Sequence, residues 1–188
     1  MLMWDESIRD LNIQLRKDNP MSISMYQASA PRFANTLQNL SGILDKANAY
    51  AEAKKVDEQV LTSMRLYPDM FALARQVQVA CDTAKGAVAR LAGVEIPKHE
   101  DTEKTFDELK ARIAKTLAFI VTVKPAQIDG CEDKEISLKL GSREVQWTGM
   151  QYLLGFALPN FYFHAATAYD ILRHNGVELA KRYFIGNP

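Results

Sequence analysis

The chain has 188 residues, a length typical of one domain and sufficient to bury a core without metal or disulfide staples. Hydrophobic residues make up 47% of it and charged residues 24%, which is typical of globular proteins. Its 23 basic and 23 acidic residues cancel, and this argues against a nucleic-acid partner. Cys81 and Cys131 are the only cysteines, so neither a thiolate zinc site nor a secreted disulfide scaffold is expected.

The first 20 residues carry charged side chains throughout and therefore do not resemble a signal peptide. They end at Asn19-Pro20, a break signal, so we expect an N-terminal extension at 1–20 and one domain at 21–188. No run of about 20 apolar residues occurs, and no membrane partner is expected. The expected location is the cytoplasm, where both cysteines would stay reduced.

The first long helix is predicted at residues 24–53. Its apolar side chains recur at helical spacing and form one stripe, namely Tyr26, Phe33, Leu37, Leu40, Leu44, Ala47 and Ala51. Pro31 lies inside this span and removes one backbone donor. We expect it either to kink the helix or to mark its true start, and in the second case Ser29 would be the N-cap residue.

The second long helix is predicted to follow Pro68-Asp69, two residue types that favour a helix start. Its apolar stripe runs at helical spacing from Met70 to Leu91 and contains many alanines, whose small side chains let a neighbouring helix come close. Gly93 is suited to the C-cap, because glycine adopts the left-handed conformation without strain.

A polar loop at residues 94–104 precedes the third predicted helix. This helix opens with a capping box, in which the Thr105 and Glu108 side chains accept hydrogen bonds from each other's backbone amides. Apolar residues at helical spacing from Phe106 to Ile120 predict a buried face, and Pro125 ends the segment.

Between residues 131 and 147 the apolar pattern changes to strict alternation, which predicts two strands. Gly141-Ser142 separates them and is typical of a two-residue type II′ hairpin. Because an isolated hairpin is only marginally stable in water, we expect it to cover the end of a helical bundle.

The last helix is predicted to open at Thr148, with Gln151 as its capping partner, and to end near Asn175-Gly176. Pro159 lies in its interior and is expected to kink it. Four long amphipathic helices joined by short or ordered connections predict an all-α fold, a four-helix bundle with a small β-hairpin before the last helix.

Of the three histidines, only His164 falls among large aromatic residues in the middle of a predicted helix. It is either a hydrogen-bonded core residue or part of a site. His99 lies in a charged loop, and we expect it to be solvated. His174 lies at a helix C-terminus, where a positive imidazole would interact favourably with the helix dipole.

Asn160 and His164 are four residues apart and therefore project from one face of the last helix. Gln78 and Asp82 form a similar pair on the second helix. If both faces point inward, the four side chains form a polar cluster that is either a hydrogen-bonded core or a small-ligand pocket. Neutral amides are weak ligands for zinc or nickel, so a high-affinity metal centre is less expected.

Three blocks carry a family resemblance: MSISMY at residues 21–26, ARQVQVACDTAKG at 74–86, and LPNFYFH at 158–164 followed by RHNGV at 173–177. They resemble a bacterial family of unknown function in the DinB/YfiT-like superfamily of metalloenzymes. The resemblance covers about residues 21–187. It implies an up-down-down-up four-helix bundle that is usually a homodimer.

In superfamily members that bind metal, one histidine of the second helix and two of the last helix hold a divalent ion, often zinc or nickel. The resemblance places His164 on one ligand position and Asn160 on its partner. Gln78 falls on the position of the second helix, with Asp82 as its nearest rival. The metal site that the resemblance implies is therefore degenerate in this chain.

Three functions follow from these observations. The first is a homodimer with a degenerate metal or small-ligand site between its helices. The alternative is an enzyme, a metal-dependent hydrolase or a low-molecular-weight thiol S-transferase that uses His164. The third is a structural or interaction protein in which the aromatic segment at residues 156–169 forms a dimer interface.

Overall fold

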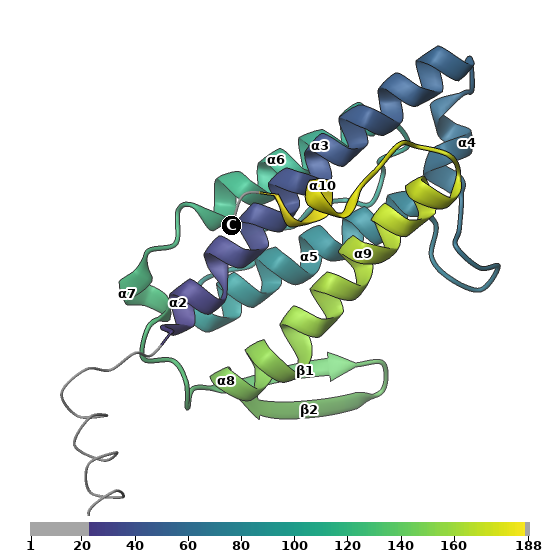
Figure 1. Cartoon of the computed structure of the whole chain (residues 1–188). Coiled ribbons are helices and arrows are strands. Elements are labelled where there is room, and N and C mark those ends of the chain that lie inside the picture. The colour runs from purple at the N-terminus through teal and green to yellow at the C-terminus, as the bar shows by residue number, and fades with distance from the viewer. Residues whose placement is uncertain (1–22, 187–188) are drawn as a thin grey trace, which may run out of the picture.

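The computed structural model describes residues 23–186, and the predicted extension at 1–20 lies outside the described residues. The described chain is mostly helical and contains a two-stranded antiparallel sheet (Figure 1). The prediction of a helical fold with a small hairpin before the last long helix is confirmed. Across residues 23–186, every helix is too short or too polar to cross a membrane.

Four long helices enclose the core, and shorter elements connect them. In chain order the elements are α2 (Met25–Ala28), α3 (Ala30–Lys54), α4 (Glu58–Ser63), α5 (Leu73–Ala92), α6 (Phe106–Ile120), α7 (Pro125–Ile128), β1 (Glu135–Leu140), β2 (Arg143–Thr148), α8 (Gly149–Tyr152), the π-helical turn η1 (Leu153–Ala157), α9 (Leu158–His174) and α10 (Lys181–Ile185). Helix α5 packs against α6 on one side and α9 on the other, and α3 contacts both α6 and α9. This arrangement gives α5 two packed faces.

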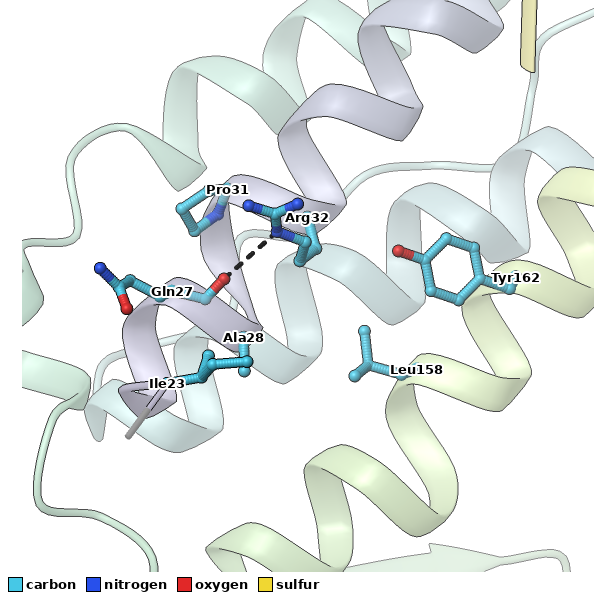
Figure 2. Close-up of a pocket in the computed structure, with 7 residues that line it drawn as sticks. All are labelled: Ile23, Gln27, Ala28, Pro31, Arg32, Leu158 and Tyr162. Atoms are coloured by element: carbon cyan, nitrogen blue, oxygen red, sulfur yellow. Dashed lines mark hydrogen bonds between the residues drawn. The ribbon is translucent and has the colours of Figure 1, made fainter. Parts of the chain in front are cut away.

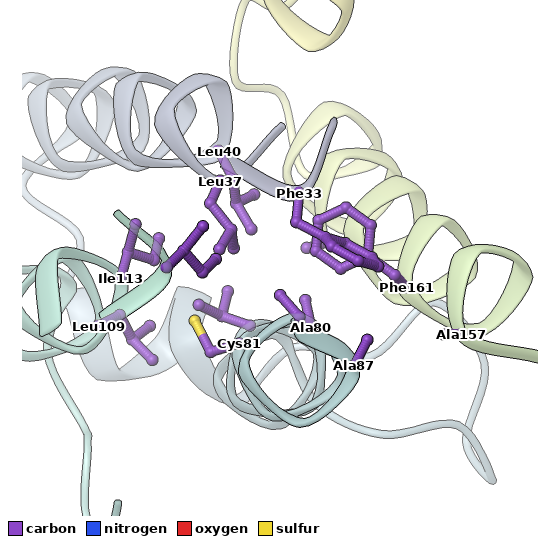
Figure 3. Close-up of a cluster of buried hydrophobic side chains, with 14 of the residues drawn as sticks. Phe33, Leu37, Leu40, Ala80, Cys81, Ala87, Leu109, Ile113, Ala157 and Phe161 are labelled. Carbon is purple, nitrogen blue, oxygen red and sulfur yellow. The ribbon is translucent and has the colours of Figure 1, made fainter. Parts of the chain in front are cut away.

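The core between these helices is assembled from the predicted apolar stripes (Figure 3). Phe33 of α3 and Phe161 of α9 meet edge to face, with ring centroids 4.9 Å apart. Leu37 and Ile113 fill the space between α3 and α6, while Ala80 lies on the facing side of α5. All five side chains are buried, and the small alanines of α5 allow its neighbours to approach closely.

The first predicted helix is divided at Ser29 into α2 and α3. Pro31 lies in the first turn of α3, where its missing amide costs no intrahelical hydrogen bond. Ser29 holds the N-cap position, but its hydroxyl donates to the Met25 carbonyl oxygen at 2.6 Å and does not cap α3. Of the two expected outcomes, Pro31 therefore marks a helix start.

Helix α5 begins at Leu73, so the prediction that Met70 belongs to its buried stripe is wrong. The Leu73 amide donates to the Met64 carbonyl oxygen at 2.9 Å, and the Arg65 guanidinium donates to the Met70 carbonyl oxygen. These contacts hold Met70 in a turn beside the helix start. At the other end Gly93 adopts the left-handed conformation, with φ of 73°, and ends α5 as predicted.

The predicted capping box at Thr105 and Glu108 is present and opens α6. The predicted hairpin is also present, since Leu140 pairs with Arg143 across the two-residue loop. Trp147 of β2 stacks on Phe156 with ring centroids 5.3 Å apart, so the hairpin rests on the start of the last helical segment. Figure 1 shows the hairpin beside α8, at one end of the long helices.

Helices α8, η1 and α9 form one continuous segment that opens with the predicted Thr148–Gln151 capping box. Pro159 lies in the first turn of α9, directly after the π-helical turn. A proline would clash with a carbonyl oxygen of a regular helix, and the wider turn lies where this clash would occur. The segment ends at Gly176, whose φ is 93°, close to the predicted stop.

Candidate functional site

Three polar contacts join α5 to the α8–α9 segment. The α5 residues are spaced seven apart, and the pairs are Gln76–His164 at 2.6 Å, Thr83–Asn160 at 2.9 Å and Arg90–Tyr152 at 3.3 Å. Residue numbers rise on α5 as they fall on its partner, so the two segments are antiparallel. We call these three pairs the α5–α9 ladder.

The ladder fixes the tautomer of the neutral His164 ring. The Gln76 Nε2 group donates to the Phe71 carbonyl oxygen at 3.1 Å, and this orients the Gln76 Oε1 towards the ring of His164. Because an amide oxygen only accepts, the His164 Nδ1 must carry the proton in this bond. The hydrogen-bond network therefore assigns the neutral ring as the Nδ1–H tautomer, which leaves a lone pair on Nε2.

Two effects keep His164 neutral. Burial lowers its pKa from the usual 6.5, and the nearby positive charge of Arg75 lowers it further. The ring is stacked with Phe71 at a centroid distance of 6.3 Å and meets Phe163 edge to face at 5.2 Å. At neutral pH the side chain is thus a hydrogen-bond acceptor and a proton acceptor in aromatic surroundings.

A cavity of about 210 Å³ lies beside this ring, and we call it the His164 cavity. It is lined by Asp69, Met70, Phe71, Gln76, Phe163 and His164. Most of its wall is apolar, and the exposed Asp69 supplies the only carboxylate among these six residues. A small-molecule site typically combines a mostly apolar wall with a small number of polar groups, which set the orientation of the ligand.

The structure does not bring the four predicted site residues into one cluster. Asn160 and His164 face α5, where their partners are Thr83 and Gln76. Gln78 and Asp82 lie on another face of α5, where Gln78 donates to Glu103 in the loop before α6 and Asp82 accepts from Arg112 of α6. Because successive residues of a helix are about 100° apart, Gln78 lies about 200° round the α5 axis from Gln76, on nearly the opposite face.

Gln78 and Asp82 belong instead to an ionic network around Arg112, which we call the Arg112 cluster. Its members are Arg112, Asp82, Asp101, Glu103 and Lys85, with Gln78 bonded to its edge. Arg112 is only 1% exposed and contacts Asp82 at 2.7 Å, Asp101 at 2.9 Å and Glu103 at 3.0 Å. Three carboxylates thus surround one buried guanidinium, and Lys85 and Arg75 supply the two further positive charges that balance them.

Sequence reasoning missed Gln76, Thr83 and Arg112. The first two carried a signal, since Gln76, Thr83 and Arg90 are spaced seven apart on one predicted helix. Arg112 also carried one, because it lies three residues after Leu109 and four before Thr116, within the buried face of α6. A charged residue at such a position predicts a buried ion pair.

The residues present do not fit the zinc or nickel ion that the resemblance implies. Asn160 and Gln78 are committed to separate partners, and His164 has no second imidazole beside it in the His164 cavity. Within residues 23–186, no group of three or more histidine, cysteine or acidic side chains is arranged to hold a metal ion. Zinc sites in proteins need several such ligands.

Comparison with known proteins agrees with this fold. The family model of a domain of unknown function, DUF1993, matches residues 25–185. The chain belongs to this family. It is also similar to the crystal structure of a DinB family member protein from Shewanella denitrificans, with 43% sequence identity and a TM-score of 0.78. That match covers 87% of this chain and 92% of the other.

A search of curated proteins finds no match. The DUF1993 assignment and the similar crystal structure together confirm the predicted resemblance to a DinB-like family of unknown function. The residues of the α5–α9 ladder lie inside the matched range. The function of this site must therefore be argued from its own geometry.

Proposed function

We propose that this DUF1993 chain is a homodimeric, DinB-like four-helix-bundle protein that binds a small molecule in the His164 cavity. The ligand is mostly apolar and carries one hydrogen-bond donor, which the bare Nε2 of His164 accepts. The observation that carries the proposal is the Gln76–His164 hydrogen bond, because it fixes both the ring orientation and the tautomer. The ion that the superfamily resemblance implies has no part in it.

The size and chemistry of the His164 cavity support this class of ligand. At about 210 Å³, it suits a molecule of roughly the size of a substituted benzene ring. The Phe71 and Phe163 side chains offer aromatic surfaces on either side of the imidazole. A donor on the ligand would satisfy Nε2, whereas a purely apolar ligand would leave this polar atom without a partner.

The up-down-down-up bundle is supported by two observations. The α5–α9 ladder makes these helices antiparallel. In contrast, α5 and α6 run in the same direction. A long connection at residues 93–105 returns the chain to the start of α5, where Asp101 contacts Arg75 and Glu103 contacts Gln78. A long crossover of this kind is found in bundles that are not simple up-and-down arrangements.

The homodimer is supported by an apolar groove of about 610 Å³ between the start of α3 and α9. Figure 2 shows Ile23 and Ala28 on one side of this groove and Leu158 and Tyr162 on the other. Ile23 is 79% exposed. Leu154, which lies on the same helical segment as Tyr162, is 53% exposed. The proposed occupant is a second copy, because a twofold interface uses the same surface on both subunits.

The alternative function is an enzyme that uses His164 as a general base, as in thiol transfer or hydrolysis. The same bare Nε2 favours it, because that atom can accept a proton from a bound thiol or water. The chain's own cysteines are not suited to act as nucleophiles. Burial raises the pKa of Cys81 to about 12 and also raises the pKa of Cys131, so both thiols stay protonated at neutral pH.

The test uses phenol and benzene as probes and follows the ¹⁵N signals of His164 by NMR. Phenol is expected to bind saturably and to shift Nε2, while benzene binds more weakly because it offers no donor. His164→Leu is expected to weaken phenol binding about tenfold, the effect of one hydrogen bond to a buried acceptor. His174→Leu is the matched control, because His174 is exposed at the end of the same helix.

Equal affinity for phenol and benzene, or an unchanged affinity in His164→Leu, would contradict the ligand proposal. The enzymatic alternative needs a turnover assay with a small thiol or ester, in which His164→Leu loses the rate and His174→Leu keeps it. Sedimentation tests the dimer separately. A monomer at all accessible concentrations would refute that part alone, whereas Tyr162→Glu is expected to dissociate a dimer.

A further inference from the structure

A second cavity, of about 330 Å³, lies on the α6 side of α5, away from His164. It is lined by Lys98, His99, Glu100, Thr102, Glu103, Arg112 and Lys115. The expectation that His99 is solvated holds only in part, because the residue is partly exposed while its Nδ1 is buried and makes no hydrogen bond within residues 23–186. The loop at 94–104 folds back over α5 and α6, and this covers a side chain whose charged neighbours predicted exposure.

The carboxylates that face Arg112 already have cationic partners. Asp82 contacts both Arg112 and Lys85, and Asp101 contacts Arg112 and Arg75. Glu103 accepts hydrogen bonds from Arg112 and from the Gln78 amide. These acids are therefore occupied, and the cavity cannot be explained as a site for a cation.

The groups without partners around this cavity are mainly donors. In the described part of the chain, Lys98 and Lys115 form no ion pair, and the Thr102 hydroxyl forms no hydrogen bond. Arg112 is only 1% exposed, and its buried Nε–H has no acceptor within the described residues. A buried donor without an acceptor costs about 1–3 kcal/mol, so an acceptor at this place would stabilise the protein.

We propose that this cavity binds the oxyanion of a small molecule, a phosphate or a carboxylate group, through Lys98, Lys115 and the Nε–H of Arg112. The two ammonium groups outnumber Glu100, the one lining carboxylate without an ion pair in the described chain, while the charge of Arg112 is already balanced by its carboxylate partners. Charge-assisted hydrogen bonds of this kind are roughly twice as strong as neutral ones. Burial and then the charge of Lys85 lower the pKa of His99, so its neutral imidazole contributes no charge to the site.

The experiment titrates the full-length protein with inorganic phosphate and, separately, with succinate, at constant ionic strength with chloride as the reference anion. Calorimetry is expected to show saturable binding at one site per chain for at least one of them. Lys98→Gln and Lys115→Gln are each expected to weaken that binding about tenfold. Lys139→Gln is the matched control, because it removes the same charge from the exposed hairpin.

The two arms identify the oxyanion, since a phosphate site favours the first titrant and a carboxylate site the second. NMR then locates the site: the ring signals of His99 are expected to shift on binding, and those of His164 are not. The proposal is overturned if neither anion saturates beyond chloride. It is also overturned if Lys139→Gln weakens binding as much as the two cavity variants, because binding would then reflect overall charge alone.

Discussion

Helix α5 presents two polar faces, and they solve the problem of burying polar groups in different ways. Towards α9 it offers Gln76 and Thr83, which form single neutral hydrogen bonds with His164 and Asn160. Towards α6 it offers Asp82, which joins several charged groups around Arg112. The first face is a chain of pairs, whereas the second is a network with one guanidinium at its centre.

The difference matters for what each face can bind. In the α5–α9 ladder every bond fixes one group, and His164, which lines a mostly apolar cavity, is left with Nε2 as an acceptor. In the Arg112 cluster the acids are neutralised, and the remaining unpartnered groups are mostly donors beside a charged cavity. One helix therefore separates the proposed site for a hydrogen-bond donor from the proposed site for an oxyanion.

The largest expected effect comes from Arg112→Leu. This change leaves Asp82, Asp101 and Glu103 close together without their central cation. Removing one partner of a buried ion pair costs about 3–5 kcal/mol, and the partial exposure of Asp82 and Asp101 places the loss at the lower end. Urea denaturation measures the loss in the free energy of unfolding. The matched control is Arg143→Leu on the exposed end of β2, expected to stay within about 0.5 kcal/mol of the parent. Similar losses in both variants would show that the cluster is energetically unimportant.

A smaller effect is expected in the α5–α9 ladder, where Thr83→Val removes the acceptor of the Asn160 amide. An unsatisfied amide costs about 1–3 kcal/mol, and partial exposure of Asn160 places the cost at the lower end. The double variant Thr83→Val/Asn160→Leu is expected to lose less unfolding free energy than the two single variants added together. The expected difference, which measures their coupling, is about 0.5 kcal/mol or more. Additive losses in the denaturation cycle would show that the pair is not coupled.

The smallest effect concerns Arg75, which belongs to the charged side but lowers the pKa of His164 on the other. Arg75→Gln is expected to raise that pKa towards 6.5, as measured by NMR titration of the His164 ring. Because the folded pKa is depressed, His164 contributes stability above pH 6.5 that is lost as the pH falls through the folded value. Arg75→Gln should reduce this acid-induced loss.

The control for that titration is Arg90→Gln, which removes the same charge from the same helix but from a position bonded to Tyr152. It is expected to leave the His164 pKa unchanged. If both variants shift this pKa equally, the effect is a general one of net charge, and the two faces of α5 are not linked through Arg75.

Much of the fold could be predicted from local signals. Capping boxes such as Thr105–Glu108 satisfy their own amides, and Gly93 ends α5 because of its own backbone freedom. These signals act within a few residues and need no tertiary context. The start of α5 was predicted wrongly because contacts from Met64 and Arg65, outside the helix, hold Met70 in a turn.

The candidate site was predicted only in part. His164 was singled out because it lies among aromatic residues, and it does line a cavity. The partner residues on α5 were assigned to Gln78 and Asp82, whereas the structure assigns Gln76 and Thr83 to that face. Spacing shows which residues of one helix share a face, but it leaves open which neighbouring helix that face meets.

The sequence by itself determined the helical periods, the hairpin and its turn, and most helix ends, because each depends on residues near one another in the chain. It also contains the blocks that are typical of the DinB-like family. Only the tertiary structure decided which polar stripe of α5 faces α9, how Arg112 is neutralised and where the two cavities lie. Those features depend on the rotation of α5 between α6 and α9. That rotation is set by the packing of the whole apolar core, in which no single local signal decides.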